Sequence, residues 1–78
     1  MTKIQRQKHI TDLNTILENA GAILDRWGMY HIGEYKFDTR EVNLKVYKAK
    51  NKIQSTPMTK LSILDFQNYI NRVSSKNQ

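Results

Sequence analysis

Residues 41–52 read Glu-Val-Asn-Leu-Lys-Val-Tyr-Lys-Ala-Lys-Asn-Lys, and this stretch decides the fold class. Apolar and polar side chains alternate strictly from Val42 to Tyr47. Because successive side chains of a strand point to opposite faces, Val42, Leu44 and Val46 are predicted to face a core. The stretch therefore predicts a half-buried strand whose other face carries Glu41, Asn43, Lys45 and Tyr47.

The residues before this strand predict its partner. Residues 30–32 and 35–37 both alternate, and the phase changes at Gly33, where a bulge or tight turn fits. Residues 38–40 then supply a turn, so the two runs form an antiparallel hairpin. The predicted pairs on its buried face join Tyr35 and Phe37 to Val42 and Leu44.

A helix is predicted before the strands. Apolar residues recur at spacings of three and four from Ile10 to Ala20. Gly21 favours a helix end at that point, because glycine readily takes the left-handed conformation that closes many helices. Gly28 is the alternative stop. We expect a helix from about Thr2 to Ala20, after which residues 22–32 begin the sheet.

A second helix is predicted near the carboxyl end. Residues 49–56 are polar and basic and indicate a loop or a frayed strand extension. Thr56 suits the N-cap and Pro57 the first helical position. The alternative makes residues 61–64 a strand, with Asp65 capping a shorter helix. The apolar stripe of this helix comprises Ile63, Phe66, Ile70 and Val73, and residues 74–78 are predicted to form a frayed tail.

These elements predict one small α+β domain over residues 1–78. It comprises an N-terminal helix, a two- or three-stranded antiparallel sheet, and a C-terminal helix packed on one sheet face. A chain of 78 residues has a thin core, and without cysteine it has no disulfide to support that core. Stability must therefore come from packing of the helices on the sheet.

The charge is strongly basic and unevenly distributed. The formal net charge is +6, from 13 basic and 7 acidic residues, and the pI is near 9.8. No acid lies between Glu41 and Asp65, and none lies in residues 1–11. Separated charges give an oriented field whose positive side attracts polyanions or acidic protein surfaces. A solvated lysine-rich face without a ligand is the alternative interpretation.

The basic residues around the clearest strand suggest nucleic-acid binding. Lysines along a strand and its following loop can neutralise phosphates, and Tyr47 could stack on an exposed base. Lys3, Arg6 and Lys8 on the first helix form a second predicted clamp. The candidate residues of the strand and loop are Asn43, Lys45, Tyr47, Lys48, Lys50 and Lys52.

A second hypothesis is protein binding. Trp27, Met29 and Tyr30 are residue types that anchor interfaces, and neighbouring residues on a strand cannot all face inward. The chain would then be a small inhibitor or adaptor, of the kind encoded by phages or mobile elements, that docks on a larger nucleic-acid-processing protein. The oligomeric state, monomer or homodimer through a sheet edge, stays open.

The remaining function classes are disfavoured. His31 with Glu34 and Asp38 is the best candidate metal cluster, but at that spacing the side chains are not expected to converge, so no metal or other cofactor is predicted. Neither a nucleophile beside a base nor a glycine-rich phosphate loop is visible, so no enzyme is predicted. No apolar run spans a bilayer, and a cytoplasmic, non-membrane protein is expected.

Overall fold

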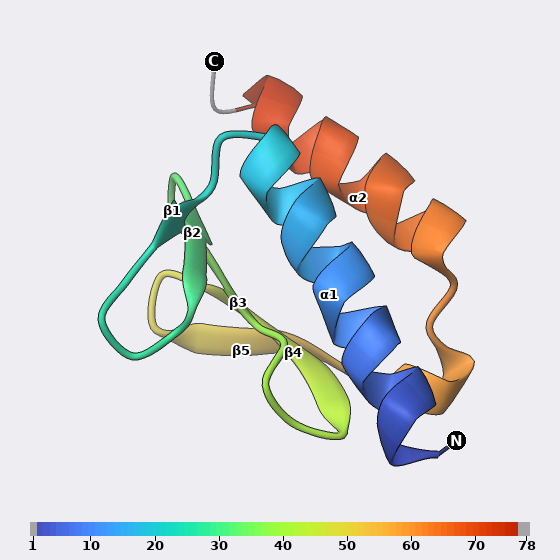
Figure 1. Ribbon diagram of the computed structural model, residues 1–78. Helices are drawn as coiled ribbons and strands as arrows, with labels where there is room; N and C mark the ends of the chain where they lie inside the picture. The colour runs from blue at the N-terminus through green and yellow to red at the C-terminus, as the bar shows by residue number, and fades with distance from the viewer. Residues whose placement is uncertain (1, 77–78) are drawn as a thin grey trace.

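The computed structural model describes residues 2–76, and it has two helices beside a five-stranded antiparallel sheet. Figure 1 shows the helices side by side and running in the same direction, with the sheet on one side of the pair. The α+β class is confirmed, but the sheet has more strands than the two or three predicted. The elements follow the order α1 (Lys3–Asn19), β1 (Ile23–Leu24), β2 (Tyr30–Ile32), β3 (Tyr35–Asp38), β4 (Asn43–Lys48), β5 (Asn51–Pro57), a 3₁₀ turn (Met58–Lys60) and α2 (Ile63–Lys76).

Helix α1 begins and ends almost where the sequence predicts. Thr2 caps it with a capping box, because its hydroxyl accepts the Gln5 N–H while the Gln5 side chain accepts the Thr2 N–H. Gly21 follows the helix with φ at +85°, a left-handed conformation that favours glycine. The predicted stop at Gly21 is therefore correct, and the alternative at Gly28 is not.

The strands pair in chain order, from β1 at one edge to β5 at the other. The alternation predicted for β4 is confirmed at Leu44 and Val46, which are 1% and 0% exposed. It is wrong at Val42, which precedes the strand and is 58% exposed. The predicted register is also wrong, since the strand starts later than expected. The observed partners of Tyr35 and Phe37 are Lys48 and Val46.

The basic segment after β4 is a strand rather than a loop. Strand β5 pairs antiparallel with β4 from Asn51 to Pro57 and is exposed along nearly its whole length. Ala49 turns the chain with φ at +55°. An edge strand held by backbone hydrogen bonds needs no apolar alternation, which explains why the sequence pattern did not reveal it.

Helix α2 starts later than predicted. Thr56 and Pro57 end β5 instead of starting the helix. Ser62 takes the capping role, with its hydroxyl accepting the Asp65 N–H at 3.3 Å. The alternative strand over 61–64 is also wrong, because α2 begins at Ile63. The predicted frayed tail is helical as far as Lys76, and residues 77 and 78 lie outside the described residues.

The core lies between the helices and one face of the sheet. Phe37 of β3 is fully buried, and its ring meets Phe66 and Tyr69 of α2 edge-on at 6.3 and 6.4 Å. Two side-chain hydrogen bonds connect α1 to the strands and their loops. The Tyr30 hydroxyl donates to Glu18, and the Thr39 hydroxyl donates to Asn14. The buried apolar side chains are Leu13, Ile16, Leu17, Tyr30, Ile32, Phe37, Leu44, Val46, Met58, Phe66, Ile70 and Val73.

Candidate nucleic-acid interface

The sheet face turned away from the core carries a row of side chains that crosses every strand. Residues directly paired across antiparallel strands share a face, so the pairings can be followed from strand to strand. Tyr47 of β4 pairs with Lys36 of β3 and, just past a register shift between Val46 and Tyr47, with Lys52 of β5. We call this side of the sheet the outer face. The complete row, in strand order, is Ile23, His31, Lys36, Tyr47 and Lys52.

Two lysines therefore flank Tyr47 on the outer face. The Lys36 ammonium already lies over the Tyr47 ring, 4.8 Å from its centroid. Cation–π contacts at exposed sites contribute about 0.5–1 kcal/mol, whereas stacking of a base on an aromatic ring contributes about 1–3 kcal/mol. A base could therefore replace Lys36 over the ring, leaving the flexible ammonium free for a phosphate.

A second outer-face row is electrically balanced. Lys45 pairs across the strands with Asp38 and Ser55. The Lys45 ammonium donates to Glu41 at 3.2 Å, and this hydrogen bond and the negative charge raise the pKa of Lys45 above its ordinary value. Asn43, at the start of β4, donates a side-chain hydrogen bond to Ser55. The charge of Lys45 is thus partly compensated.

The unpaired positive charge of the outer face lies instead at Lys36 and Lys52. Among residues 2–76, the ion pairs are Asp25 with His31, Asp38 with Arg40, and Glu41 with Lys45. Neither Lys36 nor Lys52 belongs to any of them. Lys36 was not among the residues predicted from the sequence to bind nucleic acid. Its position between Tyr35 and the buried Phe37 nevertheless indicates that its side chain points away from the core. Its position opposite Tyr47 required the register of the sheet.

Lys48 does not belong to this surface. It pairs with Tyr35, one position beyond Tyr47, and therefore projects from the opposite face. Its ammonium lies 5.6 Å from the centroid of the Tyr35 ring. Lys45 and Lys48 therefore lie on opposite faces of the sheet. Lys50 is exposed in the turn between β4 and β5.

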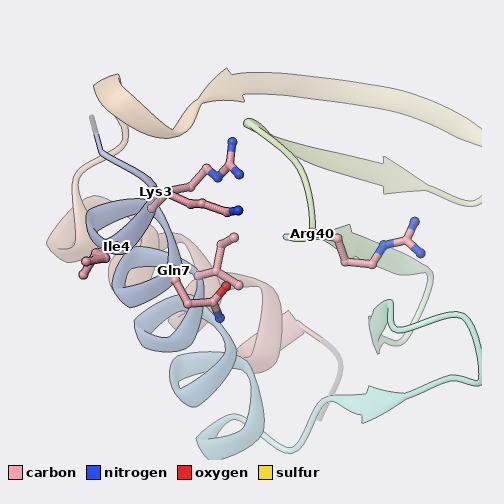
Figure 2. A pocket seen from close by; sticks show the side chains of 6 residues that line it. Lys3, Ile4, Gln7 and Arg40 are labelled. Atoms are coloured by element: carbon pink, nitrogen blue, oxygen red, sulfur yellow. The ribbon is translucent and has the colours of Figure 1, made fainter.

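The predicted clamp on α1 divides into two places. Lys3 and Arg6 line an open cavity of about 270 Å³ at the start of α1, together with Ile4, Gln7, Ile10 and Arg40. Figure 2 shows Arg40 on the loop opposite α1, with its side chain and guanidinium extending away from Lys3 and Gln7. Lys8 is exposed and is not among the lining residues. The cavity therefore gathers Lys3 and Arg6, but not the whole predicted set.

The predicted protein-contact residues have different environments. Trp27 is 61% exposed, Met29 is half-buried, and Tyr30 is 5% exposed with its ring in the core. The burial of Tyr30, and then its hydrogen bond to Glu18, raise the pKa of its phenol. Ile23 and Leu24 of β1 are also exposed, at 71% and 55%, and as successive strand residues they project to opposite faces of the sheet. Sequence reasoning had not selected these two residues.

His31 forms a side-chain hydrogen bond, as expected of a surface histidine. Its partner is Asp25, which does not belong to the candidate metal cluster of His31, Glu34 and Asp38. The His31 Nε2–H donates to Asp25 Oδ2 at 2.6 Å, while Asp25 Oδ1 accepts the N–H groups of Trp27 and Met29. These hydrogen bonds, with that from His31 the largest cause, lower the pKa of Asp25 to about 2. The carboxylate is thus the organiser of the loop between β1 and β2.

Within residues 2–76, no group of three metal-binding side chains converges. Neither helix in this part of the chain is long and apolar enough to cross a bilayer. Asp25 and His31 do not line the cavity at α1.

Comparison of the chain with protein-family models, with curated proteins and with solved structures yields no match.

Proposed function

We propose that this chain is a small, non-enzymatic accessory protein that binds nucleic acid through the outer face of its sheet. One observation supports the proposal above the others: Tyr47 lies between Lys36 and Lys52, and neither lysine is paired with an acid among residues 2–76. Positive groups on both sides of an aromatic ring are the combination that binds phosphates and a base together. The net charge of +6 would add long-range attraction to any polyanion.

Salt-dependent binding of labelled DNA and RNA tests this proposal. Each phosphate contact displaces condensed counterions, so affinity should fall linearly with salt on logarithmic axes. The double variant Lys36→Glu/Lys52→Glu should weaken binding at least tenfold. It should also flatten the salt slope by about 1.5, the effect of losing two phosphate contacts.

A matched control separates a specific face from a general effect of charge. Lys48→Glu/Lys60→Glu makes the same change in net charge, but Lys48 projects from the other sheet face and Lys60 lies in the 3₁₀ turn after β5. Binding by this control should stay within about threefold of the wild type. If both double variants lose affinity equally, the outer face is not the site. If the wild type binds neither DNA nor RNA at low salt, the proposal fails.

A protein-binding role is the second candidate, and the exposed apolar side chains of Ile23, Leu24 and Trp27 favour it. Tryptophan is among the residue types that most often anchor contact surfaces. The chain would then act as an inhibitor or adaptor on a larger nucleic-acid-processing protein. A stoichiometric complex that survives high salt and is lost in Trp27→Ala would support this role. Loss of the complex in salt, with no effect of Trp27→Ala, would contradict it.

A further inference from the structure

The Tyr47 row crosses the sheet at its full width. Its residues are successive cross-strand partners on all five strands, from Ile23 on β1 to Lys52 on β5. Neighbouring strands lie about 4.8 Å apart, so four such steps give a surface roughly 19 Å wide. Tyr47 lies inside that surface, one strand from the β5 edge. Its ring is presented by a broad sheet and not by a protruding loop.

This breadth is a poor fit to a DNA duplex. The major groove is about 12 Å wide and admits a helix or a two-stranded ribbon, but the sheet at Tyr47 is five strands wide. The bases of a duplex also keep their flat faces inside the stack. A duplex lying on this surface would therefore meet the lysines with its phosphates and leave the Tyr47 ring unused.

A single strand uses all three central groups of the row. An unpaired base has a free flat face for the Tyr47 ring, and the phosphates on either side of that base can reach Lys36 and Lys52. The two lysines are separated by two strand steps, roughly 10 Å, with the tyrosine between them. Moreover, the Lys36 ammonium lies over the Tyr47 ring, 4.8 Å from the ring centroid. A phosphate that attracts this ammonium would uncover the ring for the base.

We infer that the ligand of the outer face is single-stranded nucleic acid, with one unpaired base stacked on Tyr47 and its flanking phosphates bound by Lys36 and Lys52. The inference rests on the proposed nucleic-acid-binding function and specifies the class of ligand. DNA and RNA single strands share the chemistry that these three residues recognise. The contact is tolerant of sequence, because every base has a face that can stack.

Fluorescence anisotropy with one labelled 20-nucleotide sequence in three forms tests the inference. The probes are the single DNA strand, the same strand annealed to its complement, and the RNA strand of equal sequence. The wild type should bind both single strands at least tenfold more tightly than the duplex. Tyr47→Leu should weaken single-strand binding about 5- to 100-fold and leave duplex binding unchanged. Tyr47→Phe, which keeps the aromatic face, should remain within about twofold of the wild type.

The outcomes separate the inference from the function on which it rests. Equal affinity of the wild type for single strands and duplex, or an unchanged affinity in a folded Tyr47→Leu, overturns the single-strand inference while nucleic-acid binding stands. Absence of binding to all three probes overturns both. The ratio of single-strand to duplex affinity needs no variant, so it decides the matter even if Tyr47→Leu does not fold.

Discussion

The Nη1 of Arg40 donates a hydrogen bond of 2.6 Å to the carbonyl oxygen of Trp27 and so joins two loops of the sheet. The same guanidinium donates from Nε and Nη2 to the two carboxylate oxygens of Asp38, at 3.0 and 3.2 Å. The Asp38 side chain is only 6% exposed. The Arg40 hydrogen bonds, foremost among several causes, lower the pKa of Asp38. Arg40 thus satisfies a buried charge and holds the Trp27 loop in place.

Loss of Arg40 should therefore lower the stability of the fold mainly because Asp38 loses its partner. Arg40→Ala leaves a buried carboxylate without its partner, so the urea midpoint of unfolding should fall. Asp38→Asn in the same background should cost less than it does alone, because the two residues act as one unit. A double-mutant cycle from urea titrations measures this coupling. Strict additivity of the two substitutions would show that the contact does not stabilise the fold.

Two valines on one segment test where β4 begins. Val46 is 0% exposed, whereas Val42 is 58% exposed. Val46→Ala should lower the free energy of unfolding by about 2 kcal/mol, since it removes two buried carbons and leaves a cavity. Val42→Ala should change it by less than about 0.5 kcal/mol. Equal costs in urea unfolding would restore the sequence-based prediction that both valines face the core.

The start of α2 can be tested with two hydroxyl deletions. The Ser62 hydroxyl accepts the Asp65 N–H, whereas the Thr56 hydroxyl accepts only an exposed side-chain hydrogen bond from Gln54. Ser62→Ala should lower the free energy of unfolding by about 1 kcal/mol, the usual cost of losing a helix cap. Thr56→Ala should cost about half of that or less. A larger effect at Thr56 in thermal unfolding would instead support a helix that starts at Pro57.

Asp25 makes stability depend on acid pH. Its pKa falls from the ordinary value of 3.8 to about 2 in the folded chain. A carboxylate with a lowered folded pKa stabilises the fold above its unfolded pKa, and this contribution is lost as pH falls from about 4 to 2. Asp25→Asn should therefore be less stable at neutral pH and show a flatter stability profile over that window. Urea unfolding at a series of pH values, followed by Trp27 fluorescence, measures both. Superimposable profiles for wild type and Asp25→Asn would rule out this role for Asp25.

The spacing of apolar residues along the chain predicted the helices that bury an apolar stripe and the strand that buries one face. The spacing of the apolar residues in α1 and α2 predicted Leu13, Phe66 and Ile70 as core, and all three are buried. Alternation in β4 predicted Leu44 and Val46 correctly and gave the outward direction of Lys45 and Tyr47. These predictions succeed because a half-buried element repeats with its own backbone period.

The wrong predictions fall on segments whose pattern of buried and exposed residues does not repeat with the backbone period. Strand β5 is exposed at almost every residue, and Ala49 turns the chain without a glycine or asparagine signal. Val42 continues the alternation of β4 although the strand has not yet begun. A missed edge strand and a shifted register both change which residues are neighbours, so the candidate site changed with them.

The sequence by itself determined the α+β class, the two amphipathic helices, the basic charge and the outward direction of Tyr47. Only the tertiary structure decided that Lys36 and Lys52 flank this ring, that Lys48 lies on the opposite face, and that Glu41 compensates Lys45. The physical reason is that a strand's alternation depends on its own residues, whereas its register depends on all the strands packing and pairing together.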